Sequence, residues 1–550
     1  MLENIKVYVD LKEITIKKGI SLLELSKMYD NMYLHKIIIA KVDGEYHELN
    51  DTINKTCHIE FFDLSDKFAN RVYLNGLVYL TNYCFKELFG NKGYLNTKHS
   101  ADKGLYMEST CHLTREMLQD LECKMNEIVK NNLKIHKVTI LRDDAINYFK
   151  ETGDVKKAGL LEYMTNTYVN LYRMGNSYNY MFSLMPSETS CLDEFKLTYL
   201  NEDGFILRYP TIYSEGEIPR YKHHAKLFEV FNDSKEICKL MNLETSVDLN
   251  NKIVEGKIGD LIKITESLYT NKLLNLAKEI SNSKKVKIIL ISGPSSSGKT
   301  TTTKKLAMYL GSFGLKPKVI SMDDFFVERE DTPKNEFGQY DFECLEAIDH
   351  ELFNTTMDKL LKGEEVDLPM FNFITGKKEF KEKMKLNKED ILLIEGIHCL
   401  NPTILENIDN SKKLKIYLSA LTEINIDEDN RISTTDNRLI RRMIRDYYTR
   451  GYDPSETLEV WDNVRLGEEK YIFPNQDEAD ITINTGFVYE FPVLKVYALP
   501  LLYTIKKNSP YYEDAKRLIR LLEIFLPVPS EHIPNDSILR EFIGGSYFDK

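Results

Sequence analysis

The stretch Val286-Lys-Ile-Ile-Leu-Ile-Ser-Gly293-Pro-Ser-Ser-Ser-Gly298-Lys299-Thr300 decides the fold of the C-terminal half. An apolar run of strand length leads into a turn of glycine and serine, and a helix is predicted from Thr301 to about Tyr309. This order predicts a phosphate-binding loop, because glycines let backbone N–H groups turn inward and a helix N-terminus favours an anion. The pattern fits G-x-x-x-x-G-K-[ST], and its strand-helix context argues against a chance turn.

The loop predicts binding of ATP and Mg²⁺. Lys299 is expected to reach the β- and γ-phosphates, and the Thr300 hydroxyl is expected to ligate Mg²⁺. A phosphate-binding loop indicates a nucleotide but does not indicate the reaction. The expected nucleotide contacts within it are Gly293, Pro294, Ser295, Ser296, Ser297, Gly298, Lys299, Thr300 and Thr301.

Carboxylates follow the loop at the ends of two predicted strands. Lys318-Val-Ile-Ser-Met is followed by Asp323 and Asp324, and Ile391-Leu-Leu-Ile is followed by Glu395. Parallel strands end at the ligand crevice, so Asp323 is expected near the γ-phosphate as a general base and a Mg²⁺ ligand. Glu395 is expected to position the metal or its water shell. A helix N-cap is the alternative for Asp323 and the favoured interpretation of Asp324, whereas a solvent-facing acid is the alternative for Glu395.

A row of arginines lies further along, in Arg438-Leu-Ile-Arg441-Arg442-Met-Ile-Arg445-Asp-Tyr-Tyr-Thr-Arg450-Gly451. The first four arginines are spaced i, i+3, i+4 and i+7, which puts them on one face of a helix. Alone, such a row is typical of a solvated face. After a phosphate-binding loop it predicts a mobile lid whose arginines close over the phosphates.

Six ordered motifs resemble the uridine kinase and phosphoribulokinase family over about 285–495. They are Gly-Pro-Ser-Ser-Ser-Gly-Lys-Thr at 293–300, Ser-Met-Asp-Asp-Phe-Phe at 321–326, Asp341-Phe-Glu-Cys-Leu-Glu-Ala-Ile-Asp349, Leu368-Pro-Met-Phe-Asn-Phe373, Leu393-Ile-Glu-Gly-Ile397 and the arginine row. The resemblance implies a P-loop kinase that transfers the γ-phosphate of ATP to a hydroxyl of a small molecule, with a nucleoside such as uridine or cytidine as the expected acceptor.

The resemblance also implies roles for matching residues. Asp323 corresponds to the catalytic base, and Glu343 corresponds to a carboxylate that binds ribose hydroxyls. Phe371 and Phe373 correspond to aromatic residues that pack on the base of the acceptor. The expected arginine clamp consists of Arg441 and Arg445 on the nucleotide, Arg442 on the acceptor, and Arg450, which joins Asp323 and Lys299 in the catalytic set.

The sequence departs from the family at three positions. Uridine kinases usually have Asp where this chain has Glu343, and Tyr where it has Phe371. Their histidine that reads the pyrimidine edge aligns near Gly376, which has no side chain. Losing polar contacts can change specificity by orders of magnitude. Transfer to a hydroxyl is therefore expected, while the acceptor stays open between a nucleoside and another hydroxylated metabolite, a sugar or a polyol.

The first 62 residues form a predicted small α/β module. Gly19-Ile-Ser-Leu22, the strand Ile37-Ile-Ile-Ala-Lys-Val42, the turn Asp43-Gly44 and the closing Ile59-Glu-Phe-Phe62 carry its pattern. These features resemble the TGS domain, a ubiquitin-like module at the N-terminus of threonyl-tRNA synthetases.

Residues 63–230 are predicted to be mixed α/β, with helices at Val72–Phe89 and Leu113–Asn132. Because this segment follows a TGS-like module, it resembles the second additional domain of threonyl- and alanyl-tRNA synthetases. That domain hydrolyses mischarged tRNA with zinc held by His-x-x-x-His and Cys-x-x-x-His. Neither ligand pair occurs in this segment, so the fold is expected without the metal.

These segments together predict an α/β chain of five parts. The combination resembles a bacterial fusion family usually labelled nucleoside kinase, and it raises the expectation of RNA or tRNA contact through the N-terminal half. The expected parts are 1–62, a ubiquitin-like TGS module; 63–230, an α+β synthetase-like region without zinc ligands; 231–285, a helical connector; 286–495, a P-loop NTPase-type parallel sheet flanked by helices; and 496–550, a helical C-terminal extension of two helices and a tail.

Composition limits the remaining classes. The 550 residues are 42% hydrophobic and 29% charged, which is typical of a globular protein, and the net charge of -12 argues against non-specific nucleic-acid binding. Eight cysteines without a C-x-x-C pair predict reduced thiols. The N-terminus lacks a signal-peptide pattern and no apolar run approaches ~20 residues, so we expect a cytoplasmic protein without membrane contact. An oligomer remains open.

Two other functional classes also stay open. The chain could be an RNA-associated regulator that uses its P-loop as a nucleotide sensor, but Asp323 and Glu395 favour catalysis. ATP turnover separates these two. It could instead be a trans-editing hydrolase, against which the missing zinc ligands argue.

Overall fold

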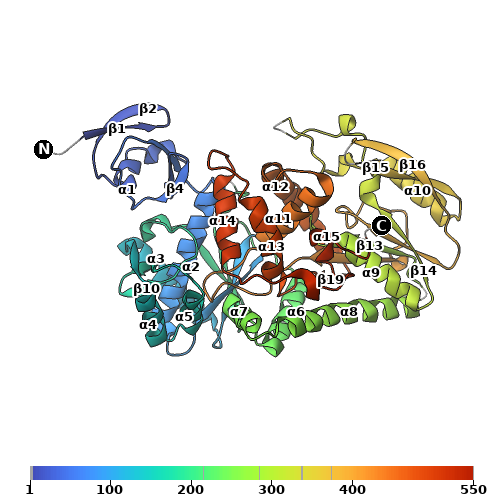
Figure 1. Ribbon diagram of the computed structural model, residues 1–550, viewed down its shortest axis with the longest axis horizontal. Helices are drawn as coiled ribbons and strands as arrows, with labels where there is room; N and C mark the ends of the chain where they lie inside the picture. Colours follow the sequence, from blue (N-terminus) through green and yellow to red (C-terminus); the bar gives the residue numbers. More distant parts are fainter. Residues whose placement is uncertain (1–3, 215, 284, 336–337, 373–374, 549–550) are drawn as a thin grey trace. The chain divides into compact units, whose positions relative to one another are not determined.

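The computed structural model describes residues 4–214, 216–283, 285–335, 338–372 and 375–548. The chain divides into two compact units. Figure 1 labels the helices and strands and colours them along the sequence from blue to red. None of the described helices combines the length and the apolar character that crossing a membrane requires. Unit 1 comprises Met1–His224, Glu244–Val247 and Ile424–Ser433, and unit 2 comprises Ala225–Leu243, Asp248–Glu423 and Thr434–Lys550.

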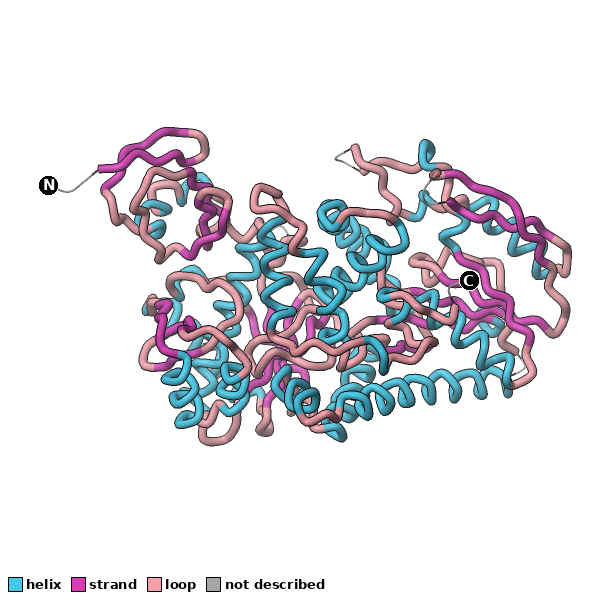
Figure 2. Tube along the Cα trace, in the orientation of Figure 1, coloured by secondary structure: helices cyan, strands magenta, loops and turns pink. Residues whose placement is uncertain are grey.

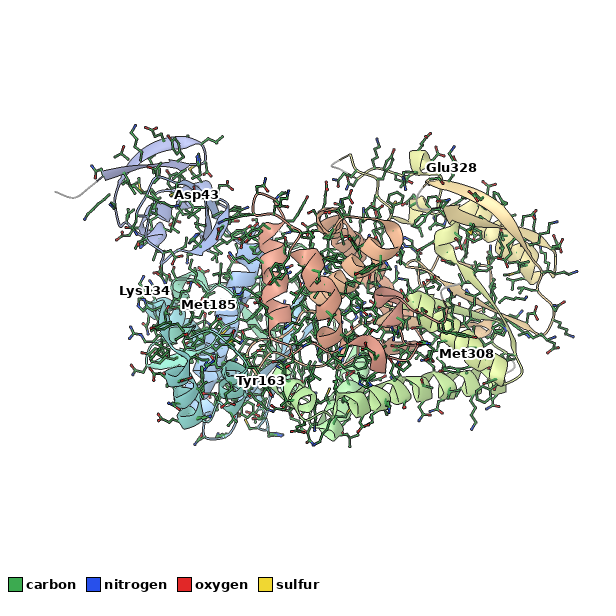
Figure 3. All side chains as sticks on the ribbon, viewed as in Figure 1. Asp43, Lys134, Tyr163, Met185, Met308 and Glu328 are labelled. Atoms are coloured by element: carbon green, nitrogen blue, oxygen red, sulfur yellow. The ribbon has the colours of Figure 1, made fainter. Side chains whose placement is uncertain are left out.

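A five-stranded mixed sheet lies within residues 4–62 of unit 1, in the segment for which a ubiquitin-like module is expected. The strand order is β2-β1-β5-β3-β4, with β1 and β5 parallel and the other pairs antiparallel. The predicted turn Asp43-Gly44 joins β3 to β4, and Asp43, labelled in Figure 3, accepts a hydrogen bond from the His58 N–H at 2.9 Å. The elements are β1 (Asn4–Val9), β2 (Lys12–Lys17), α1 (Leu22–Ser26), β3 (Ile39–Val42), β4 (Glu45–Glu48) and β5 (His58–Phe62).

The rest of unit 1 is the α+β region. A long helix, α2 (Lys67–Phe89), lies within a core shared by a four-stranded sheet of order β11-β12-β7-β6 and a three-stranded sheet of order β10-β9-β8. Both helices predicted from sequence are present, the second as α3 (Arg115–Asn131). The other elements are β6 (Leu95–Ala101), β7 (Gly104–Ser109), β8 (Ile135–Leu141), α4 (Arg142–Thr152), α5 (Val155–Glu162), β9 (Tyr168–Met174), β10 (Ser177–Asn179), β11 (Lys196–Asn201) and β12 (Gly204–Arg208).

Residues 424–433 belong to unit 1 although both of their neighbours along the chain belong to unit 2. Asp429 forms a buried ion pair with Lys157 and accepts a hydrogen bond from Asn179 Nδ2 at 2.8 Å. Asn430 donates to the Tyr180 carbonyl at 3.1 Å and accepts from the Phe182 N–H at 2.9 Å. These ten residues are therefore built into unit 1, which contiguous sequence boundaries at 230 and 286 do not anticipate.

Unit 2 is built on a five-stranded parallel sheet of order β14-β17-β13-β18-β19, which confirms the predicted P-loop NTPase-type sheet. Its strands appear in magenta in Figure 2. The phosphate-binding loop follows the central strand, so the loop lies between the ends of two neighbouring strands. The strands are β13 (Ile288–Ser292), β14 (Lys316–Ser321), β17 (Asp390–Glu395), β18 (Lys413–Ser419) and β19 (Ile481–Asn484), all aligned parallel.

Helices and one β-ribbon complete unit 2. The expected connector is helical, with a 26-residue helix, α8, that packs along the helix after the phosphate-binding loop. The ribbon pairs β15 (Val366–Asn372) with β16 (Lys377–Met384) antiparallel. The helices are α6 (Ala225–Met241), α7 (Ser246–Val254, which begins in unit 1), α8 (Ile258–Ser283), α9 (Lys299–Ser312), α10 (His350–Leu361), α11 (Thr434–Arg445), α12 (Pro454–Gly467), α13 (Glu490–Leu502), α14 (Tyr512–Glu523) and α15 (Arg540–Ile543).

Candidate active site

The phosphate-binding loop has the backbone that its sequence predicts. Ser296 and Gly298 have φ values of +59° and +80°, and α9 begins directly after Gly298. Positive φ is uncommon for a serine, so the chain accepts strain to close this turn. A Cβ on Gly293 would lie 2.4 Å from the Leu418 carbonyl oxygen, which leaves room only for glycine.

Lys299 and Thr300 begin α9 on the inner side of the loop. The Lys299 ammonium is buried and donates to the carbonyls of Gly293 and Pro294 at 2.9 and 3.2 Å. The Thr300 hydroxyl donates to Glu395 Oε1 at 3.1 Å. The register of β13 against β17 pairs Ile291 with Glu395, and this pairing brings the strand-end carboxylate beside the loop.

The two adjacent aspartates after β14 have different surroundings. The strand ends at Ser321, and both aspartates lie on a short 3₁₀ turn, Met322–Phe325, rather than on the strand end expected from sequence. Asp323 lines the cavity described below, whereas Asp324 accepts a hydrogen bond from the Phe371 N–H at 3.3 Å. Burial raises the pKa of Asp324 to about 6.

Glu395 is almost fully enclosed. It accepts hydrogen bonds from Thr300 and from the Ser321 hydroxyl, the latter at 3.2 Å. Burial, and then the negative charge of Asp323, raise the pKa of Glu395 to about 7. A cation placed between these two carboxylates would relieve their repulsion, which is the electrostatic signature of a site for a divalent metal.

Glu343 is a second, partly buried carboxylate beside the loop. Burial raises its pKa to about 7, although Arg442 acts in the opposite direction, and its Oε2 atom is buried without a hydrogen-bond partner. Gly467, the last residue of α12, makes room for this side chain, because a Cβ there would lie only 2.3 Å from Glu343 Cβ. An enclosed carboxyl oxygen without a protein partner is suited to a ligand hydroxyl.

Aromatic and basic groups form another wall of the site. Phe371 on β15 is buried and packs edge-to-face on Phe326 at 5.6 Å between ring centroids. Gly376, in the turn after β15, has φ +71°, and a Cβ there would lie 2.7 Å from Arg329 Cβ. The Arg329 side chain therefore fills the space where uridine kinases are expected to carry a histidine. The predicted contact Phe373 lies outside the described residues.

The arginines on α11 fall into two groups, of which the first is buried and supports the loop backbone. Arg438 and Arg441 are fully buried. Arg438 pairs with Glu468 at 2.7 Å and donates to the Ser295 carbonyl, while Arg441 pairs with Glu490 at 2.8 Å and donates to the Ser296 carbonyl at 3.2 Å. Arg441 is not among the residues that line the cavity described below, and it supports the loop backbone from behind. Its expected contact with the nucleotide stays a prediction.

The remaining arginines converge on one carboxylate. Arg442 donates to Asp446 at 3.1 Å and to the Ser295 hydroxyl at 2.8 Å, and Arg445 donates to Asp446 at 2.9 Å. Arg450 lies 3.6 Å from the same carboxylate, at the end of a π-helical turn, Asp446–Arg450. Burial opposes ionisation of Asp446, but the arginines outweigh it and hold its pKa below the usual range. Arg445 and burial lower the pKa of Arg450 to about 10.

A cavity of about 430 Å³ joins these groups. It combines backbone N–H groups, four arginines and a lysine with several carboxylates and an aromatic wall. This chemistry is suited to a polyanion with a divalent cation beside a hydroxylated ring. Among the residues that line it are Ser295, Ser296, Ser297, Gly298, Lys299, Thr300, Asp323, Phe326, Glu343, Phe371, Glu395, Arg442, Arg445, Asp446, Arg450 and Glu541.

Sequence reasoning missed several participants. Asp446 is adjacent to Arg445, and an acid within an arginine row is the signal that could have identified it. Glu468 lies 30 residues from its partner Arg438, and Glu490 lies 49 residues from its partner Arg441. The sequence around these acids does not predict either pairing. Glu541 comes from the C-terminal extension, for which the sequence offered no function.

Comparisons with known proteins find relatives of both halves of the chain. Residues 288–490 match the Phosphoribulokinase / Uridine kinase family. The uridine kinase of Borreliella burgdorferi (strain ZS7) is 32% identical over 201 residues, which cover 36% of this chain and 87% of that protein. The uridine kinase of Borrelia duttonii (strain Ly) is 33% identical over 202 residues, with the same two coverages.

The N-terminal region has a different relative. The threonine--tRNA ligase of Clostridium kluyveri (strain NBRC 12016) is 27% identical over 168 residues, which cover 30% of this chain but only 26% of that protein. This match agrees with the synthetase-like resemblance of the N-terminal part. The match of residues 288–490 and the coverage of 87% of two uridine kinases place the C-terminal half in one family. The chain belongs to the phosphoribulokinase/uridine kinase family.

Proposed function

We propose that this protein is an ATP-dependent kinase that transfers the γ-phosphate to a hydroxyl of a small molecule, most fittingly a nucleoside related to uridine or cytidine. The observation that carries this proposal is the cavity, because it unites a phosphate-binding loop with Asp323 and with a separate aromatic wall that holds Glu343. A nucleotide sensor would need the loop but would not need a base and an acceptor pocket.

The residues present fit ATP and Mg²⁺. Lys299, Arg442 and Arg445 would hold the phosphates, and Thr300, Asp323 and Glu395 are the oxygen donors available to Mg²⁺. Among the described residues no group of three or more His, Cys, Asp and Glu is arranged to hold a metal. The two carboxylates, Asp323 and Glu395, are compatible with Mg²⁺, because Mg²⁺ commonly takes only one or two carboxylates and completes its shell with phosphates and water. When bound, Mg²⁺ would supply charge neutralisation for phosphoryl transfer.

The protein's own groups would carry the proton and orient the acceptor. Asp323, on the cavity wall beside the loop, would take the proton of the attacking hydroxyl. Glu343, with its pKa raised to about 7, can either donate a hydrogen bond to an acceptor hydroxyl or accept one from it near neutral pH. Arg450 would balance the charge that moves during transfer.

Support for a nucleoside is weaker than support for phosphoryl transfer. Phe371 offers a ring face to a base but no hydroxyl, and Arg329 fills the space beside Gly376. A sugar or polyol therefore stays the alternative acceptor. A site built for hydrogen bonding rejects analogues strongly, so the pattern of accepted compounds will reveal which polar contacts remain.

A screen of ATP consumption tests the proposal. The purified full chain with Mg²⁺ and ATP is incubated with nucleosides, sugars and polyols, and both ADP and the phosphorylated product are measured. We expect acceptor-dependent ADP formation with one class, and loss of that formation in Asp323→Asn. ADP formation that no acceptor stimulates, or none at all with ATP bound, would favour the nucleotide sensor instead.

RNA or tRNA contact through the N-terminal half remains a secondary proposal. It is supported by the match to a threonine--tRNA ligase over 168 residues. The net charge of -12 predicts weak and salt-sensitive binding at most. A filter-binding titration of the full chain with total tRNA at two salt concentrations tests it, and the absence of binding at low salt would remove the proposal.

A further inference from the structure

The C-terminal extension ends in a segment that lies on the phosphate-binding loop. We call residues 530–548 the tail segment; it contains α15. Its Ile538 side chain meets Gly298 of the loop so closely that a Cβ on that glycine would lie 2.5 Å from Ile538 Cγ2. The Phe542 ring lies over the buried Arg441 guanidinium, 5.0 Å from its carbon to the ring centroid. The tail segment therefore contacts both the loop and the helix that supports it.

Polar contacts on both sides of α15 hold the tail segment in place. The ammonium of Lys305, itself buried on α9, lies 2.9 Å from the Asp536 carboxylate, and Lys304 donates to the Phe548 carbonyl at 3.2 Å. Arg540 donates to the carbonyls of Ser530 and Ile533 at 2.8 Å each. Because both ends are fixed, α15 presents its side chains at a defined position above the loop.

Glu541 is the side chain that α15 presents to the loop. Its Oε2 atom accepts hydrogen bonds from the Thr301 N–H at 3.2 Å and from the Thr301 hydroxyl at 2.7 Å, and Glu541 lines the same cavity as Lys299 and Asp323. Thr301 is the third residue of α9, so its N–H is one of the free donors that a helix N-terminus offers to an anion. A carboxylate thus occupies donors that a phosphate-binding loop provides for phosphate.

We propose that Glu541 is a built-in phosphate mimic, which occupies the Thr301 donors when nucleotide is absent and must leave them before ATP binds in full. The proposal rests on the proposed function in that it takes the loop to bind ATP. Two anions cannot share one N–H and one hydroxyl, so each molecule of nucleotide competes with the tail segment. Release needs only rotation of the Glu541 side chain, because the anchors at Asp536 and Phe548 lie outside the contact.

This competition lowers the affinity for ATP without blocking it. When the competent state is a minor fraction, the apparent dissociation constant rises by the inverse of that fraction. A carboxylate bonded to a helix N-terminus and a hydroxyl is a charge-assisted contact of the kind that biases such an equilibrium by about tenfold. Removing the carboxylate should therefore tighten ATP binding by about tenfold.

The test measures equilibrium binding of Mg²⁺ and a non-hydrolysable ATP analogue to the full chain by calorimetry. We expect Glu541→Ala to bind about tenfold more tightly than the wild type, with Glu541→Gln between them, because glutamine keeps an acceptor but loses the charge. Glu531→Gln is the matched control: it removes the same charge from an exposed position on the same segment and should bind like the wild type. Thermal unfolding of each variant verifies that it is folded.

The other outcomes are decisive as well. Unchanged affinity in folded Glu541→Ala would overturn the phosphate mimic and leave the proposed kinase function standing. Weaker binding would identify Glu541 as a contact that assists the nucleotide, which is the opposite of the proposal. A failure of the wild type and of both Glu541 variants to bind would overturn the proposed function and the mimic together, whereas binding by the variants alone would support the mimic strongly.

Discussion

Replacing Gly467 by alanine tests whether the acceptor side of the cavity depends on a glycine in α12. The residue has φ −61° and ψ −42°, so helix propensity alone predicts that alanine stabilises the fold by about 0.5–1 kcal/mol. The new Cβ would lie 2.3 Å from Glu343 Cβ and 2.9 Å from its Cγ. The two Cβ atoms would have to separate by roughly 1.2 Å to reach a carbon contact of about 3.5 Å.

The steric effect should exceed the gain in propensity. Overpacking a well-packed interior typically costs about 1–3 kcal/mol, so the net loss should be roughly 0.5–2 kcal/mol and Tm should fall by a few degrees. The displaced Glu343 should raise KM for the acceptor by about tenfold, since the hydrogen bond that we propose between Glu343 and a substrate hydroxyl would be lost. KM for ATP should change little, because the loop is untouched.

Thermal unfolding and steady-state kinetics with both substrates measure these effects. Gly311→Ala is the control, because Gly311 also lies in a helix, α9, and a Cβ there would meet nothing within 4 Å. It should raise stability by about 0.5–1 kcal/mol without a kinetic effect. The reasoning is refuted if Gly467→Ala is as stable as the wild type and has an unchanged acceptor KM.

Lys299→Ala should abolish detectable phosphotransfer while keeping the circular dichroism spectrum, because it removes the cation on the β- and γ-phosphates; near-normal turnover would contradict the nucleotide site. Asp323→Asn should reduce turnover about 10²–10⁴-fold with little loss of ATP affinity, whereas Asp324→Asn should be much milder, since its carboxylate bonds the Phe371 N–H. The opposite order of severity would exchange the two roles. Elemental analysis should find no stoichiometric zinc, because the synthetase ligand pairs are missing; one zinc per chain would disprove this. Glu343→Gln should raise Tm at pH 8 and have little effect at pH 5. Burial raises the pKa of Glu343 to about 7, so its ionisation opposes folding above that pH, and the penalty fades as pH falls toward the unfolded value of about 4.5; equal shifts at both pH values would contradict the assignment.

Local patterns in the sequence were sufficient for much of the site. The loop at 293–300 depends on glycine conformations and on a following helix, and both can be predicted from neighbouring residues. The same holds for Asp323 and Glu395, because strands that follow a phosphate-binding loop end at one edge of a parallel sheet. Asp323 lines the cavity and Asp324 accepts a hydrogen bond from the Phe371 N–H, both from the same 3₁₀ turn, and the catalytic role expected of Asp323 stays a prediction.

Local sequence patterns do not predict which residues far apart in the sequence pair with one another. The spacing of the arginines predicts a shared helical face but cannot say which of them meet a buried acid. Arg441 is neutralised by Glu490 on α13, and that pairing removes it from the cavity. Glu541 reaches the loop from 240 residues away. Such contacts depend on how elements pack, which periodicity within one element does not encode.

The ten residues 424–433 determine when unit 1 can be completed during translation. An N-terminal domain usually folds while later segments are still being made. Here the buried partner of Lys157 is Asp429, which leaves the ribosome only after β13, α9 and most of the parallel sheet have been translated. Until then Lys157 and Asn179 lack the Asp429 carboxylate as a partner, and unit 1 stays incomplete. A fragment cut at residue 230 reproduces that nascent state, so its solubility reports how well the unfinished unit survives alone.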